Sequence, residues 1–165
     1  MIDAKVQDAL NKHVTSELFS SNLYLAMSAW CEANAYKGFG RWLRVQAEEE
    51  RTHSLKILDF VLARGGQARL GAVAAPDGGW KSVLEVFKAV QAHERKVSES
   101  IDALHARAVA QKDTATQVFL QWFVSEQVEE ESMAAEIVDK LTLIGDKPAT
   151  ILYLDKEYGK RGRAS

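Results

Sequence analysis

Apolar residues recur at steps of three and four along four long stretches of the chain, a spacing that places them on one face of an α-helix. Gly65-Gly66 and Gly145 follow two of these stretches, where glycine commonly ends a helix. The pattern predicts an all-α fold with helices over residues 3–34, 38–64, 80–111 and 114–144. Each helix should turn its apolar face, here called a stripe, toward the core, with Leu25 on the first stripe and Leu62 on the second.

The segment between the second and third predicted helices has no sustained period. Residues 65–79 include five glycines and Pro76, which predicts a loop. Fifteen extended residues reach about 50 Å, whereas a helix of some 26 residues is about 39 Å long. The loop can therefore run the length of a bundle and connect two parallel helices. We expect an antiparallel four-helix bundle with a long crossover between helices 2 and 3.

A short fifth helix is expected near the C-terminus. Lys147-Pro148 separates the bundle from a segment running from Ala149 to about Tyr158, and its Ile151 and Leu152 need a partner surface. Residues 160–165 form a polar, basic tail that we expect to be frayed. The 165 residues fit one domain, with the bundle over about 3–144 and the short helix over about 149–158.

Polar residues interrupt each apolar stripe near its middle. They are Glu17 in the first stripe, Glu50 and His53 in the second, Glu94 in the third, and Gln127 and Glu130 in the fourth. The members of each pair lie three residues apart and share a helix face, so each pair can direct its ligand atoms to one point.

Four buried carboxylates require compensation. Burying one ionised carboxylate costs several kcal/mol, so four without countercharge would exceed the roughly 5–15 kcal/mol that stabilise a domain. Arg51 and Arg95 do not neutralise them, because each lies about 100° around its helix from the adjacent stripe glutamate. Either the carboxylates are protonated or paired, or two divalent cations lie among them. Oxygen ligands with one imidazole suit iron or manganese, and a site of this kind can oxidise Fe(II).

Other polar residues near the stripes allow two interpretations. The hydroxyl of Tyr24 could hydrogen-bond a ligand carboxylate or an unrelated partner. Three further glutamates could form an outer cation site or an ordinary charged flank: Glu49, Glu126 and Glu129. Three histidines fall at stripe edges or outside, which predicts surface or boundary positions: His13, His93 and His105.

Composition excludes several classes of protein. The net charge of −2 and the pI near 6.1 provide no basic field for nucleic acid. No run of about 18 apolar residues exists to span a membrane, and the polar N-terminus does not resemble a signal peptide. Cys31 is alone, so neither a disulfide within the chain nor a cysteine-based metal centre can form. We expect a cytoplasmic protein.

The stripe residues, together with Met27-Ser28-Ala29-Trp30-Cys31 and the segment 119–127, resemble the non-haem bacterial ferritins over nearly the whole chain. The resemblance implies a homo-oligomeric shell of twenty-four subunits that oxidises Fe(II) with O₂ or H₂O₂ and stores a ferric oxide mineral. It also implies the roles of the residues. Glu17 and His53 would bind one iron, Glu94 and Glu130 the other, with Glu50 bridging and Gln127 beside the second iron. Glu49, Glu126 and Glu129 would form a third iron site.

Haem is not expected, since Arg51 and Glu130 stand where bacterioferritin has Met and His. The alternative from the enzyme class is a di-iron oxidase or peroxidase that forms no cage and acts on a small organic substrate. A purely structural bundle with protonated or paired carboxylates is the third possibility.

Overall fold

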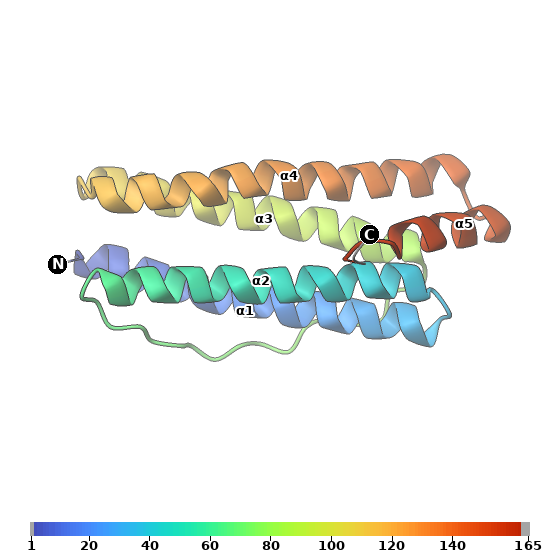
Figure 1. Cartoon of the computed structure of the whole chain (residues 1–165), viewed down its shortest axis with the longest axis horizontal. Helices are drawn as coiled ribbons and strands as arrows, with labels where there is room; N and C mark the ends of the chain where they lie inside the picture. Colours follow the sequence, from blue (N-terminus) through green and yellow to red (C-terminus); the bar gives the residue numbers. More distant parts are fainter. Residues whose placement is uncertain (1, 163–165) are drawn as a thin grey trace.

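The structure, a computed structural model, describes residues 2–162, and these form five α-helices (Figure 1). The helices are α1 (Ala4–Ala33), α2 (Lys37–Ala63), α3 (Val83–Ala110), α4 (Thr114–Ile144) and α5 (Pro148–Tyr158). The first four form an antiparallel bundle in which the α1/α2 pair packs on the α3/α4 pair. The predicted fold class and the short fifth helix are confirmed.

Short polar side chains determine where helices begin. The Asp3 carboxylate accepts hydrogen bonds from the backbone N–H groups of Lys5 and Val6 at the start of α1. The Ser82 hydroxyl accepts from the backbone of Glu85, and the Glu85 carboxylate accepts from the backbone N–H of Lys81. This reciprocal cap begins α3 at Val83, three residues later than the apolar pattern predicted.

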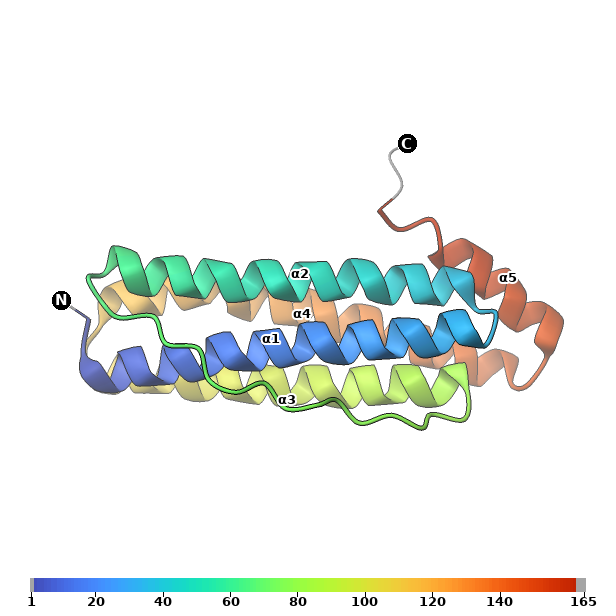
Figure 2. The same ribbon diagram turned by 90° about the horizontal axis from the view of Figure 1, so that it is seen from below.

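The crossover connects two parallel helices, as its length predicted. It leaves the end of α2, runs back along the bundle and reaches the start of α3 at the opposite end (Figures 1 and 2). Polar side chains at steps of four on α1 hold its first part: Gln7 accepts from the backbone of Gln67, and Thr15 from that of Gly71. Asn11, between them, bonds the crossover backbone twice, as donor and as acceptor.

The bundle interior consists of two apolar clusters. One includes Met27, Phe39 and Phe87, and the other includes Leu10 and Ile57, toward the beginning of α1. The buried polar residues of the four stripes lie between these clusters in the sequence of each helix. The core is therefore interrupted by a polar layer near the middle of the bundle.

The predicted burial of three side chains was wrong: two leucines expected in the core are exposed, and one histidine expected at the surface or boundary is buried. Leu25 and Leu62 are 49% and 52% exposed, although the stripe predicted them inside. Each follows a fully buried residue, Tyr24 or Val61, and a step of one residue turns the side chain by about 100°. His13, expected at the surface or boundary, is only 3% exposed.

Helix α5 docks on the beginning of α2. No side chain of the preceding residue caps α2, and the Asp155 carboxylate of α5 instead accepts from the backbone N–H groups of Gly38 (3.0 Å) and Phe39 (2.8 Å). A Cβ at Gly38 would lie 1.7 Å from the Asp155 carbonyl oxygen, so only glycine permits this approach. The contact fixes where the chain continues after α5.

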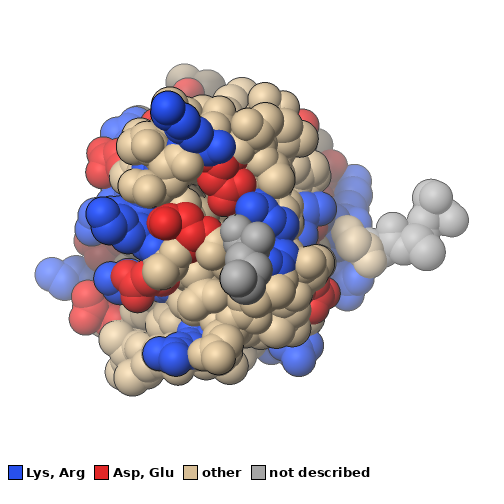
Figure 3. Space-filling model, turned by 90° about the vertical axis from the view of Figure 1, so that its left-hand side faces the viewer, with Lys and Arg blue, Asp and Glu red and all other residues tan. Residues whose placement is uncertain are grey.

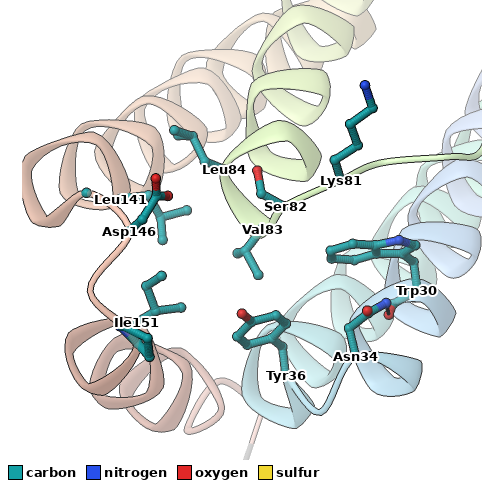
Figure 4. A pocket seen from close by; sticks show the side chains of 12 residues that line it. Trp30, Asn34, Tyr36, Lys81, Ser82, Val83, Leu84, Leu141, Asp146 and Ile151 are labelled. Atoms are coloured by element: carbon teal, nitrogen blue, oxygen red, sulfur yellow. Dashed lines mark hydrogen bonds between the residues drawn. The ribbon is translucent and has the colours of Figure 1, made fainter.

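A cavity of about 320 Å³ remains beside α5 (Figure 4). Trp30, Tyr36, Val83 and Ile151 surround it, and Asp146 is its one acidic lining residue. None of the polar stripe residues lines it, so this cavity is separate from the carboxylate cluster.

One end of the bundle carries mixed charge (Figure 3). At the end of the bundle where α1 begins, Lys and Arg side chains alternate with Asp and Glu over the visible face (Figure 3). None of the helices over residues 2–162 combines the length and apolarity that crossing a membrane requires.

Candidate metal centre

Side chains from all four bundle helices meet in the polar layer. Two groups have one ligand atom per residue within 4.8 Å of one another: Glu17, Glu50 and His53, and Glu50, Glu94 and Glu130. Every member is buried. Because Glu50 belongs to both groups, its two carboxylate oxygens can serve two adjacent metal positions.

The first group contains an unpaired buried oxygen. His53 Nδ1 lies 3.5 Å from Glu50 Oε2 and 4.0 Å from Glu17 Oε2, longer than ordinary hydrogen bonds. Glu17 Oε2 has no hydrogen-bond partner. A buried carboxylate oxygen without a partner is costly, and a cation bound among these three side chains removes that cost.

His13 is a neighbour of the first group that the sequence did not reveal. Its Nε2 lies 2.8 Å from Glu17 Oε1, and its Nδ1 lies 3.1 Å from the Ser100 hydroxyl. The spacing of four residues between His13 and Glu17 was the available signal, since such residues are neighbours on a helix. His13 thus contacts one carboxylate oxygen of Glu17, and the other oxygen is the one without a hydrogen-bond partner.

The second group is held by hydrogen bonds to Glu94. The Tyr24 hydroxyl donates to Glu94 Oε1, the contact that the sequence had left open. Gln127 Nε2 donates to Glu94 Oε2 at 3.1 Å and also lies within hydrogen-bond distance of the Ser98 hydroxyl, at 3.3 Å. Both oxygens of Glu94 are therefore oriented by neutral donors, which do not cancel its charge toward a metal.

Gln46 is a second residue that sequence reasoning missed. Its side chain is fully buried, and its Nε2 donates to Glu50 Oε1 (3.0 Å) and Glu130 Oε2 (2.7 Å). One amide therefore links the shared carboxylate of the two groups to a carboxylate of the second. The spacing of four between Gln46 and Glu50 was a signal, but a neutral amide beside apolar Leu43 and Ala47 does not stand out in a hydrophobic pattern.

Burial and mutual repulsion change the acidity of the cluster. Burial, followed by the charge of Glu17, raises the pKa of Glu50 well above its ordinary value. Burial and the charge of Glu94 raise the pKa of Glu130 to about 8, against the hydrogen bond from Gln46. Burial also opposes ionisation of Glu17, but its contacts with His13, Glu50 and His53 together outweigh burial and lower the pKa of Glu17. Without metal, the cluster therefore retains protons that a cation must displace.

The three outer glutamates do not join these groups. Among residues 2–162, no cluster with ligand atoms within 4.8 Å contains Glu49, Glu126 or Glu129. Glu49 instead pairs with Arg161 and lines an open cleft of about 490 Å³ beside His53 and Trp122. The cleft gives solvent an approach to the imidazole of the first group.

The fold and the site define a class: four-helix bundles that bind metal with carboxylates from every helix. The chain matches the ferritin family, described as a ferritin-like domain, over residues 7–144. It is 45% identical over 161 residues to the bacterial non-heme ferritin of Bacteroides fragilis, covering 98% of this chain and 100% of that one. The chain belongs to the ferritin family.

Further relatives and solved structures agree. The bacterial non-heme ferritin of Staphylococcus aureus is 39% identical, with 98% of this chain and 97% of that one covered. The open pore ferritin of the hyperthermophilic archaeon Archaeoglobus fulgidus has 45% sequence identity and a TM-score of 0.96, over 98% of this chain and 99% of that one. An engineered closed form of the Archaeoglobus ferritin has a TM-score of 0.97 at 44% identity, covering 99% of this chain and 100% of that one. As a member of this family, the protein is an iron-storage ferroxidase.

Proposed function

We propose that the protein oxidises Fe(II) at two adjacent positions inside each subunit. Glu17, His53 and Glu50 hold the first ion, and Glu50, Glu94 and Glu130 hold the second. The observation that carries the proposal is that Glu50 belongs to both three-residue groups. A carboxylate shared in this way places two metal ions close enough to act together.

Charge supports two ions rather than one. Four buried glutamates can supply four negative charges, which two divalent ions balance. Hard carboxylate oxygens favour Fe(III) over Fe(II), so the site makes electron loss from the substrate more favourable. Two Fe(II) supply two electrons, which with two protons reduce one O₂ to H₂O₂. H₂O₂ can itself accept two electrons and two protons to give water, so either oxidant balances.

Tyr24 and Gln127 orient the second position. Their hydrogen bonds to Glu94 hold its carboxylate in one rotamer before metal arrives. Gln127 then acts beside the second iron, with its amide oxygen available to that ion. We further propose that Glu49, Glu126 and Glu129 bind a third iron on its way out of the centre.

Assembly completes the storage function. We propose a shell of twenty-four subunits in the cytoplasm, with Fe(II) and O₂ or H₂O₂ as substrates. Large apolar side chains that remain exposed on the single subunit support assembly, including Leu143 (87%), Leu152 (53%) and Tyr153 (62%). Sedimentation tests the shell, because a monomer or dimer that never assembles contradicts storage and favours a di-iron oxidase or peroxidase without a cage.

Aerobic addition of Fe(II), followed by ferric absorbance and particle size, tests the site. Glu50→Gln combined with Glu130→Gln removes two ligand charges with little change of shape, and we expect the fast oxidation of the first irons per subunit to disappear. Glu48→Gln combined with Glu99→Gln removes two exposed charges and serves as the matched control. If the first pair oxidises iron as fast as the wild type, the assigned site is wrong.

A further inference from the structure

The first residues of the C-terminal tail, 160–162, lie on the bundle near the metal centre instead of fraying, whereas residues 163–165 lie outside the described part of the chain. Asp155 fixes α5 on the beginning of α2, and the chain then runs beside α2 (Figure 2). Arg41 donates from Nε to the carbonyl oxygen of Arg161 (3.2 Å) and from Nη2 to that of Gly162 (3.1 Å). The tail backbone is thus held on α2 through residue 162.

Arg161 makes three side-chain contacts from this position. Its guanidinium carbon lies 4.4 Å from the centre of the Trp42 ring, its Nη1 donates to Gln46 Oε1 at 2.8 Å, and its Nη2 pairs with Glu49. The Arg161 side chain is only 19% exposed. Stacking on an aromatic ring and hydrogen bonds to two acceptors together hold the Arg161 guanidinium in one position.

The contacts join the tail to the metal ligands through one amide. Arg161 binds the oxygen of Gln46, which turns the Gln46 nitrogen toward Glu50 and Glu130. A flipped amide would present oxygen to both carboxylates, and the Arg161 bond opposes that flip. Arg161 is therefore a positioning residue for Gln46, and its own charge lies one side chain away from the two groups.

Arg161 also forms an ion pair with a carboxylate oxygen of Glu49, one of the three outer glutamates. We propose that Arg161 is a built-in counter-cation that competes with metal for Glu49, so that a cation binds Glu49 only when the tail leaves α2. The proposal rests on the proposed function, because it concerns the outer iron site beside the two-metal centre. It makes the C-terminal tail a regulator of how metal moves between the centre and the open cleft.

Anaerobic calorimetric titration of the assembled, metal-free protein with Zn²⁺ tests the competition without redox chemistry. We expect two tight ions per subunit and a weaker third in the wild type. Arg161→Gln removes a unit positive charge beside a partly exposed carboxylate, and we expect the third ion to bind about tenfold more tightly. Arg161→Lys keeps the charge and should stay near the wild type, as should the tail control Lys160→Gln, because the Lys160 ammonium pairs with Glu157 and not with Glu49.

A double variant identifies Glu49 as the contested ligand. In Glu49→Gln combined with Arg161→Gln, the gain in affinity for the third ion should vanish. An unchanged third affinity in Arg161→Gln, or a gain that persists without the Glu49 carboxylate, overturns the competition. Failure of the wild type to bind two tight ions would instead overturn the two-metal site, so the two failures are distinguishable.

Hydrogen exchange of the wild type provides a measurement that needs no variant. The backbone N–H of Arg161 donates to the Tyr158 carbonyl at 3.2 Å, within the same turn whose Arg161 carbonyl oxygen accepts from Arg41 of α2. Saturating the third position with Zn²⁺ should speed exchange in the peptide that contains residues 159–162 relative to protein with two ions bound. Equal exchange in the two states overturns the release of the tail.

Discussion

Tyr24 and Glu94 lie 70 residues apart in the chain, and the buried Tyr24 hydroxyl donates a hydrogen bond to Glu94 Oε1. The hydroxyl connects α1 to α3 across the polar layer. Burial and the nearby charge of Glu94 raise the pKa of Tyr24 well above its ordinary value, so the phenol remains a proton donor throughout the neutral range. The contact therefore fixes one ligand oxygen without adding charge.

Tyr24→Phe removes this donor with little change of volume. We expect the first-turnover rate of Fe(II) oxidation to fall about tenfold or more, the usual effect of removing a residue that orients a ligand. The free energy of unfolding of the metal-free protein should fall by about 1–2 kcal/mol. Stopped-flow ferric absorbance and thermal unfolding measure the two effects. Tyr36→Phe, at a tyrosine that lines the separate cavity beside α5, is the control, and equal rates in both variants would contradict the role of the bond.

The raised pKa of Glu130, about 8, predicts opposite pH trends for stability and metal affinity. Between its ordinary value of 4.5 and about 8, the folded state retains a proton that the unfolded chain has lost. This contribution to metal-free stability is therefore complete below pH 4.5 and is lost as the pH rises through about 8. Glu17, whose pKa is lowered, contributes stability that is lost only as the pH falls below the ordinary range.

Metal binding should follow the reverse trend, because a cation must displace the proton. We expect affinity for Zn²⁺ at the second position to rise by up to about tenfold per pH unit until the pH passes the pKa of Glu130. Titrations at several pH values, beside thermal unfolding of the metal-free protein, measure both slopes. Glu130→Gln should flatten the stability slope, and an unchanged slope in that variant would assign the proton to another group.

Asp155→Ala should release α5 from the bundle. The variant loses two charge-assisted hydrogen bonds at the beginning of α2, which corresponds to about 1–2 kcal/mol. We expect faster hydrogen exchange in residues 148–158 and at the first turn of α2. Asp139→Ala, at an exposed position of α4, is the matched control. Unchanged exchange in Asp155→Ala would mean that packing alone holds α5.

Gln46→Met retains the length and burial of the side chain but removes both donors to the cluster. Because Glu50 and Glu130 lose a shared partner, we expect slower oxidation of the first irons by about tenfold. The pKa of Glu130 should rise further, since the Gln46 hydrogen bond lowers it. Rapid-mixing kinetics test the prediction against Gln121→Met at an exposed position, and wild-type kinetics in Gln46→Met would contradict it.

The site residues that the sequence predicts are those that interrupt an apolar stripe. Glu17 and Glu94 are single acidic residues among apolar residues that face the core. Glu50 and His53 lie three residues apart and so share one helix face. The burial of these side chains and their approach to one another therefore follow from helical periodicity. Leu25 and Leu62 show the limit of the same method. An apolar pattern predicts which side of a helix faces the core only to within about one residue. Tyr24 and Val61, the residues just before Leu25 and Leu62, are the ones that point inward.

The sequence by itself determined the helices, the crossover that connects two parallel ones and the carboxylates at the centre, because each depends on local period or chain length. Only the tertiary structure decided that Gln46 links two ligands, that His13 faces Glu17 and that Arg161 returns to Glu49. These contacts depend on how α5 docks and on which rotamers the packed helices leave open. Arg161 and Glu49 are 112 residues apart, and no local pattern specifies a pairing over that distance.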